Sequence, residues 1–226
     1  MSVFKKLCIG PTNCFLIPDN KGYLLIDTGW PGRYCHFLNI LKRIHINISE
    51  INLILLTHHH YDHIGNLNQI VLHSQARVMI HSQEVQYLKN RTKATLKGTN
   101  FTGKLLSKFL SKFHSPPQPF ELRKQDIILT ESVFPLHHLG IEGIVLHTPG
   151  HTLGSISLIF EGKFAFVGDT IMNLPFTSPL PLFAEDLKLL FKSWERILSY
   201  NPQTIYPAHG NSITASKLYS KLKNIS

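Results

Sequence analysis

The sequence predicts an α/β fold with two sheets face to face and helices on the outside. Two strand-rich blocks, one in each half of the chain, are each followed by helical segments. The stretches LLIDTG and FAFVGDT each place an aspartate just beyond an apolar strand. With 226 residues, 43% of them hydrophobic and 16% charged, the chain can bury a core, so we expect neither disorder nor a coiled coil.

The first half of the chain alternates between predicted strands and helices. Apolar runs bounded by turn residues predict the strands, and Pro31 suits the start of a helix. The run 51–57 is almost continuously apolar, as expected of a strand that is buried on both faces. The predicted strands span about 13–17, 22–26, 51–57 and 77–81, and the predicted helices span about 31–44 and 64–73.

The second half repeats this alternation. Strands are predicted at about 127–129, 143–147, 155–160 and 163–167, followed by a helix over 184–199. A short strand into Tyr206 and a final helix from about Thr214 complete the chain. Because no linker separates the two halves, we expect a single domain over residues 1–226, with a basic helical insertion at about 87–124.

That insertion carries most of the net charge of +9. Residues 87–124 hold nine lysines and arginines against one acid, Glu121. Such local charge does not favour general binding to nucleic acid, and we expect no DNA partner. Apolar residues from Phe101 to Phe113 follow helical spacing, whereas Lys104, Lys108 and Lys112 recur every four residues on another face. The helix is therefore either an ordinary packed element, a lid over an active site, or a surface for anionic or acyl-bearing substrates or lipid headgroups.

Cysteine content and apolar run length predict the compartment. The three cysteines, Cys8, Cys14 and Cys35, cannot all pair, and no C-x-x-C motif is present. No apolar run approaches the roughly 18 to 20 residues of a membrane span, and Gly10 and Pro11 interrupt the start before a signal peptide could develop. We therefore expect an unexported cytoplasmic protein with free thiols and no membrane span.

A histidine-rich segment follows the buried strand of the first half. Residues 57–63 read THHHYDH, which contains the pattern H-x-H-x-D-H, in a chain with 14 histidines. Side chains two residues apart on an extended strand point the same way, so His58 and His60 can hold one cation. His59 then faces elsewhere, and we interpret it as a packing residue or as a support for the ligands.

Further candidate ligands each follow a predicted strand. Asp62 and His63 lie where the chain turns back into the next helix, and the later candidates are His151 in TPGHTLGS, Asp169 in VGDT and His209 in YPAHG. Asp27, after an early strand, is either a turn residue or an acceptor for the far N–H of a metal-bound imidazole.

In this order the motifs resemble the metallo-β-lactamase fold superfamily, and the match runs from Asp27 to His209. The resemblance implies a four-layer αββα sandwich of two mixed sheets with helices outside. It also implies a binuclear site in which Asp169 bridges the two metals. The first metal would be held by His58, His60 and His151, and the second by Asp62, His63 and His209.

The same resemblance bears on the metal and on the chemistry. The diiron oxidoreductases of this fold typically have glutamate where His60 stands, so we expect two Zn²⁺ ions, with iron or manganese as alternatives. The best-known zinc β-lactamases carry cysteine or serine where Asp169 stands, so we do not expect antibiotic hydrolysis. Two ions about 3.5 to 4 Å apart would share a bridging hydroxide, which Asp62 or Asp169 would orient and deprotonate.

Among the branches of the superfamily, the motifs are most similar to the glyoxalase II group, which hydrolyses hydroxyacyl-glutathione thioesters. Those enzymes usually add a helical C-terminal domain, whereas only 17 residues follow His209 here. We therefore expect a zinc-dependent hydrolase for a small ester or thioester that is anionic or acyl-bearing, with contacts from Lys104, Lys108 and Lys112. The alternatives are a lactonase or phosphodiesterase or nuclease of the same fold and, from another class, a non-catalytic metal-binding module.

Overall fold

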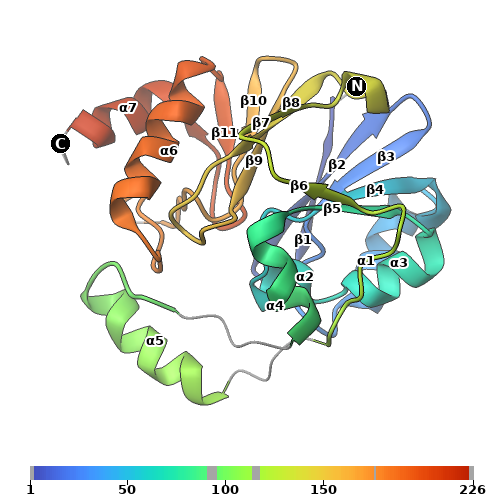
Figure 1. Cartoon of the computed structure of the whole chain (residues 1–226), viewed down its shortest axis with the longest axis horizontal. Coiled ribbons are helices and arrows are strands. Elements are labelled where there is room, and N and C mark those ends of the chain that lie inside the picture. Colours follow the sequence, from blue (N-terminus) through green and yellow to red (C-terminus); the bar gives the residue numbers. More distant parts are fainter. Residues whose placement is uncertain (1–2, 91–95, 114–117, 176, 224–226) are drawn as a thin grey trace. The chain divides into compact units, whose positions relative to one another are not determined.

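The computed structural model describes residues 3–90, 96–113, 118–175 and 177–223, and for 108–113 it describes the backbone alone (Figure 1). The chain divides into two compact units. Unit 1 comprises Met1–Thr92, Pro116–Thr130 and His137–Ile141, and unit 2 comprises Lys93–Ser115, Glu131–Leu136 and Glu142–Ser226. Among the described residues, none of the helices has both the length and the apolar character needed to cross a bilayer.

Unit 1 is built on a mixed sheet of six strands in the order β1-β2-β3-β4-β5-β6. The strands are β1 (Lys5–Ile9), β2 (Thr12–Asp19), β3 (Gly22–Ile26), β4 (Ile51–Leu55), β5 (Arg77–His81) and β6 (Ile127–Leu129). The first three pair antiparallel, and β3 to β6 pair parallel. Because parallel strands end at the same edge of a sheet, the loops after β3, β4 and β5 are brought together there.

The helices of unit 1 bury one face each against this sheet. They are α1 (Tyr34–Arg43), α2 (Tyr61–Ile64), α3 (Leu67–Ser74) and α4 (Val85–Asn90), with the 3₁₀ turns η1 (Ile48–Glu50), η2 (Ser82–Glu84) and η3 (His137–Leu139). Phe37 and Leu41, one turn apart on α1, lie in one buried cluster with Leu16 and Leu25 of the sheet. Burial of such a side chain contributes about 1.5–3 kcal/mol, so this face anchors α1.

Unit 2 is built on a second mixed sheet of six strands, in the order β12-β11-β10-β9-β8-β7. The strands are β7 (Val133–Pro135), β8 (Gly143–His147), β9 (Ile156–Phe160), β10 (Phe164–Phe166), β11 (Thr204–Tyr206) and β12 (Ile213–Thr214), and the helices are α5 (Phe101–Phe113), α6 (Leu187–Ser199) and α7 (Ala215–Lys223). Only β10 and β11 pair parallel.

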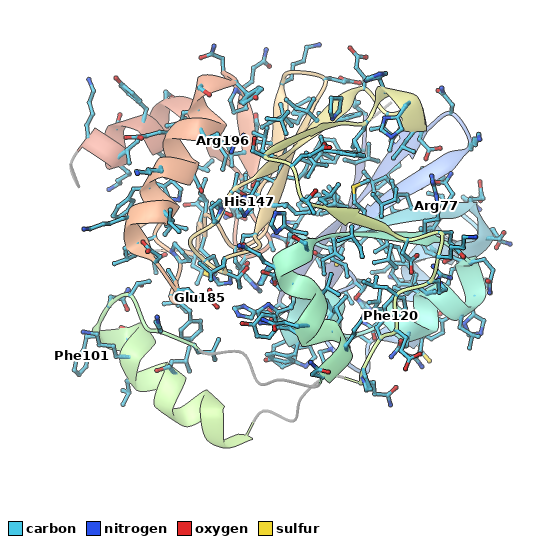
Figure 2. All side chains as sticks on the ribbon, in the orientation of Figure 1. Arg77, Phe101, Phe120, His147, Glu185 and Arg196 are labelled. Carbon is cyan, nitrogen blue, oxygen red and sulfur yellow. The ribbon has the colours of Figure 1, made fainter. Side chains whose placement is uncertain are left out.

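Helix α6 packs on the unit 2 core through Leu190, Trp194 and Ile197. Trp194 is fully buried, and its indole N–H donates to the Thr170 carbonyl at 2.7 Å. Arg196 donates to the carbonyl oxygens of Ser132 and His147 at 2.9 and 3.2 Å, which ties the helix to the segment around β8 (Figure 2). The Trp194 hydrogen bond fixes the loop after β10, where Thr170 lies, against the helix.

The structure corrects several predicted element boundaries. The predicted helix over 31–44 begins only at Tyr34, because Gly32 adopts a φ of +71° that no helix contains. The predicted helix over 64–73 corresponds to α3, which begins only at Leu67, whereas Ile64 ends the separate short helix α2. Strands β1, β7 and β12 were not predicted from the sequence. The helix predicted from residue 184 begins at Leu187, where the side chain of Asp186 caps it.

Candidate metal centre

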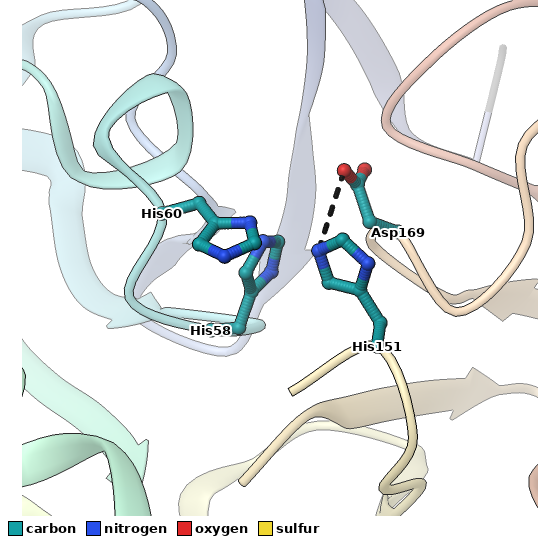
Figure 3. Close-up of side chains that lie close together, drawn as sticks. All are labelled: His58, His60, His151 and Asp169. Atoms are coloured by element: carbon teal, nitrogen blue, oxygen red, sulfur yellow. Dashed lines mark ion pairs between the residues drawn. The ribbon is translucent and has the colours of Figure 1, made fainter. Parts of the chain in front are cut away.

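Unit 1 supplies the histidine-rich segment that follows β4. His58, His60 and His63 are 0%, 7% and 0% exposed, so the segment is built into the protein and is not a solvated loop. The ring centroid of His58 lies 4.5 Å from that of His60 and 4.0 Å from that of His63 (Figure 3 draws His58 and His60). Three imidazoles therefore gather within unit 1.

Helix α2 holds His63 in place by close packing against the loop after β3. The backbone N–H of Thr28 donates to the His63 carbonyl at 2.6 Å, and the Thr28 hydroxyl donates to the same carbonyl at 2.9 Å. Gly65 permits this approach, because a Cβ atom there would lie 2.4 Å from the Pro31 nitrogen. The short helix is thereby fixed at the edge of the sheet.

Asp27 anchors the histidine segment from the other side. Its Oδ2 lies 2.8 Å from Nδ1 of His63, and it also accepts hydrogen bonds from the backbone and hydroxyl of Thr57, both at 2.8 Å. Asp27 has a φ of +57°, in the left-handed region that aspartate adopts more readily than most residues other than glycine. An ionised carboxylate only accepts hydrogen bonds, so Nδ1 of His63 carries the proton and Nε2 carries the lone pair.

Asp62 lies beside that Nε2 at a distance that does not correspond to a hydrogen bond. The separation between Asp62 Oδ2 and His63 Nε2 is 3.7 Å, and the Thr12 hydroxyl donates to the same Oδ2 at 3.4 Å. Two donors that bind one zinc ion at 2.0–2.2 Å with tetrahedral angles lie about 3.4 Å apart. The Asp62–His63 spacing is therefore close to that of two ligands of a shared metal ion.

Unit 2 supplies three further candidates from the ends of its strands. Asp169 follows β10, and its carboxylate oxygens lie 3.6 Å from Nε2 of His151 (Figure 3) and 3.4 Å from Nε2 of His209. Both distances again match two ligands of one ion better than a hydrogen bond. Nδ1 of His151 donates to the Phe183 carbonyl at 2.8 Å, so Nε2 of this ring also carries the lone pair.

The donor set within each unit fits a divalent transition metal. Imidazole nitrogens with the far nitrogen hydrogen-bonded, combined with carboxylates, are the ligands that zinc and iron take in proteins. Asp169 is only 4% exposed, and a buried carboxylate is stable only with a compensating partner. Tyr61, between the candidate ligands His60 and Asp62, stays neutral, because burial and the charge of Asp62 raise the pKa of its phenol.

The remaining predicted site residues are placed differently. His59 turns toward Glu84 and Tyr87. On α5, Lys104 is exposed, whereas the side chains of Lys108 and Lys112 lie outside the described part of the chain. Glu84 and the Phe183 carbonyl were not singled out from the sequence, because each reaches the histidines only through strand pairing or backbone contacts.

Comparison with known proteins decides the family. Residues 9–209 match the model described as the metallo-β-lactamase superfamily. The chain belongs to the metallo-β-lactamase superfamily. It is 32% identical to a protein named as a probable metallo-hydrolase of Methanocaldococcus jannaschii, over 88% of this chain and 87% of that protein. Because the superfamily is hydrolytic, membership supports the predicted class of metal-dependent hydrolase.

Other members of the metallo-β-lactamase superfamily are longer than this chain. A β-lactamase-like protein 2 homolog of Drosophila melanogaster is 31% identical over 89% of the chain, which spans 59% of that protein. A hydroxyacylglutathione hydrolase of Erwinia tasmaniensis is 27% identical over 79% of the chain, which spans 53% of that protein. The predicted resemblance to the glyoxalase II group thus has a counterpart among the relatives.

Solved structures of the superfamily share the fold. The B3 metallo-β-lactamase BLEG-1 has a TM-score of 0.73 at 24% identity, and 96% of each chain is covered. A protein solved in a di-iron-bound form has a TM-score of 0.66 at 24% identity, covering 96% of this chain and 98% of the other. Together with the two six-stranded mixed sheets, these likenesses confirm the predicted αββα fold class.

Proposed function

We propose that this chain is a binuclear zinc hydrolase that cleaves an ester or thioester of a small, anionic or acyl-bearing molecule. The observation that carries the proposal is the position of Asp169, whose two oxygens face the Nε2 atoms of His151 and His209 at 3.6 and 3.4 Å. A carboxylate placed between two imidazole nitrogens at these distances is suited to bridge two cations.

The proposed ligands are those expected from the sequence. One ion would be held by His58, His60 and His151 and the other by Asp62, His63 and His209, with Asp169 shared between them. This assignment also proposes that the two units act as one domain over 1–226, with residues 87–124 as an insertion. For the metal itself we propose zinc, since His60 occupies the position where the diiron oxidoreductases typically have glutamate, and a di-iron-bound relative in fold makes iron the alternative.

The metal ions would lower the pKa of a bound water toward about 7 and polarise the carbonyl of the substrate. The chain itself supplies orientation and proton transfer. Asp27 and the Phe183 carbonyl hold the Nδ1 protons of His63 and His151, which fixes the tautomer of each ring. A carboxylate oxygen of Asp62 or Asp169 would accept the proton of the attacking water and return it to the leaving group.

The substrate class rests on the motifs and on the basic segment. The similarity to a hydroxyacylglutathione hydrolase favours a thioester. Lys104 is exposed on α5, and with Lys108 and Lys112 it would attract an anionic group. We place this reaction in the cytoplasm, where the free thiols of Cys8, Cys14 and Cys35 would stay reduced.

A substrate panel tests this function. The zinc-loaded protein is assayed on S-lactoylglutathione, an acyl-homoserine lactone and bis-p-nitrophenyl phosphate, each with Asp169→Ala and with chelator-treated protein as controls. We expect thioester hydrolysis that both controls abolish. Turnover of the lactone or the phosphodiester alone would replace the proposed substrate by one of the alternatives. Two bound zinc ions without turnover on a broad panel would favour the binding module.

A further inference from the structure

We propose that Glu84 is a positioning residue for the metal-binding segment and acts through the backbone and ring of His59. Nothing in the superfamily assignment or in the proposed ligand set gives this carboxylate a role. The inference rests on the proposed function, because it concerns how firmly His58 and His60 are presented to a metal. All the residues involved belong to unit 1.

Strand pairing explains how Glu84 reaches the segment. Strands β4 and β5 pair in parallel, and the backbone N–H of Leu56, just beyond β4, donates to the Met79 carbonyl of β5 at 2.9 Å. The two strands therefore end side by side. The histidine segment continues from the end of β4, and the turn η2, which ends at Glu84, continues from the end of β5.

Glu84 holds His59 at two points. Its Oε2 accepts a hydrogen bond from the backbone N–H of His59 at 2.9 Å, and the same oxygen contacts Nδ1 of the His59 ring. Since a carboxylate only accepts, Nδ1 is the protonated nitrogen of that ring. Tyr87 stacks on the ring, with 3.9 Å between centroids and an interplanar angle of 9°. Backbone and side chain of His59 are thus both fixed.

His58 consequently lies between two anchored peptide groups. The N–H of Thr57, on one side, donates to Asp27, and the N–H of His59, on the other, donates to Glu84. Both carboxylates are 1% exposed, so both bonds form where an unpaired partner would be costly. Rotation of either peptide group would swing the His58 ring. The two bonds therefore fix the direction in which this imidazole points.

Zinc affinity tests the role of Glu84 separately from activity. The dissociation constants of wild type, Glu84→Ala and Glu84→Gln are measured by competition with a chromophoric chelator. Loss of a group that orients ligands typically weakens metal binding 10- to 100-fold, and we expect about that loss for Glu84→Ala. Glu84→Gln keeps an oxygen for the His59 N–H but loses the charge facing Nδ1, so it should recover part of the affinity.

Asp126→Asn is the matched control. Asp126 is a buried carboxylate of unit 1 that accepts the N–H of Val78 in β5 at 2.8 Å, without contact to the histidine segment among the hydrogen bonds described. It should destabilise the metal-free protein and leave zinc affinity unchanged. At saturating zinc, Glu84→Ala should lower kcat more than it raises KM, because substrate contacts are untouched.

The outcomes separate this proposal from the function on which it rests. Zinc affinity of Glu84→Ala within twofold of wild type, with a stability loss like that of Asp126→Asn, would overturn the positioning role. If Glu84→Ala does not fold, unchanged affinity in Glu84→Gln has the same meaning. Weakened zinc binding in a protein that hydrolyses nothing would support the role of Glu84 and reject only the reaction. A wild type that binds no zinc would overturn both.

Discussion

Asp169 is the single residue on which the proposed centre depends most. Its carboxylate faces His151 and His209, so Asp169→Ala should release at least one metal ion and lower turnover by about 100-fold or more. Asp169→Asn keeps the shape of the side chain but not its charge, so its metal content and turnover should lie between those of Asp169→Ala and those of wild type. Elemental analysis and a turnover assay of the same preparations measure both effects. Two retained metals with full turnover in Asp169→Ala would show that the site is misplaced.

The three consecutive histidines should respond differently to alanine. His58→Ala and His60→Ala should each abolish metal binding at one position, because their rings are the proposed ligands. His59→Ala should keep both metals, because the backbone N–H that donates to Glu84 survives. It should cost about 1–3 kcal/mol of the free energy of unfolding, because the ring no longer packs on Tyr87 and the buried Glu84 carboxylate loses its Nδ1 partner. Metal analysis and urea unfolding of the three variants test this contrast. Equal loss of metal in all three variants would contradict it.

The sequence indicated the candidate ligands and, as a support for one of them, Asp27, but it did not indicate Glu84 or the Phe183 carbonyl. H-x-H-x-D-H is visible because strand alternation and the helix turn act over a few residues, so neighbours in sequence are neighbours in space. Glu84 is 25 positions from His59, and only the pairing of β4 with β5 brings the two together. The acceptor for His151 is a backbone carbonyl, that of Phe183, which no pattern of side chains could indicate.

At the scale of elements, several strongly apolar strands were predicted with their bounds, whereas β1, β7 and β12 were not predicted. Strands β3, β5, β6 and β8 have the predicted bounds, and β4 lies within the predicted range. Strand β1 reads KKLCI, where charges mask the alternation, and β12 has two residues, too few for any period to appear. These strands exist because neighbouring strands pair with them, which depends on the tertiary structure.

Helix α5 offers a test of the basic segment. Its start is tied to unit 2 by the Thr99 hydroxyl, which donates to the Pro181 carbonyl at 2.6 Å, yet Phe101 (labelled in Figure 2) and Leu105 are 83% and 64% exposed. Because the lysine row of α5 is proposed to attract an anionic substrate, replacing Lys104, Lys108 and Lys112 by glutamate should raise KM severalfold for such a substrate and leave KM for a neutral ester unchanged. The effect should shrink with added salt, since screening acts over about 10 Å at 0.1 M.

Helix α7 provides the matched control for that charge reversal. Replacing Lys217, Lys221 and Lys223 of α7 by glutamate changes the net charge by the same amount as the α5 replacements, but on another helix of unit 2. If the position of the α5 lysines matters, the α7 variant should leave KM for the anionic substrate unchanged. If only the net charge of +9 matters, it should raise that KM as much as the α5 variant does. Unchanged KM at low ionic strength in the α5 variant, for every anionic substrate tested, would make α5 an ordinary structural helix.

At the scale of the whole molecule, acid stability depends in part on Asp126. Burial alone would raise the pKa of this carboxyl, but hydrogen bonds from the Arg123 side chain and from the N–H groups of Arg123 and Val78 outweigh burial and lower it. A carboxyl with a lowered folded pKa stabilises the fold above its unfolded value of about 3.9, and that contribution is lost as the pH falls below it.

Asp126→Asn should accordingly lower the free energy of unfolding at pH 7 by about 1–3 kcal/mol and flatten its decline in acid. Urea unfolding at pH 7, 4.5 and 3 measures both the offset and the slope. Curves for variant and wild type that run parallel down to pH 3 would show that the Asp126 pKa is not lowered by folding.

The architecture of the whole molecule was predictable at the level of layers and motif order. Two strand-rich blocks and the ordered ligand motifs sufficed for the αββα class, which the superfamily match over residues 9–209 confirms. The substrate was not predictable in the same way, because it depends on side chains that a fold can vary without changing its sheets. The metal centre is therefore the part of the account that a direct measurement can decide.

Metal content is that measurement. Protein produced in zinc-supplemented medium, freed of loosely bound ions and analysed for all transition metals, should contain about two equivalents of metal per chain. This number follows from seven proposed ligands in which Asp169 is shared between His151 and His209. Less than half an equivalent in folded protein would contradict the binuclear centre.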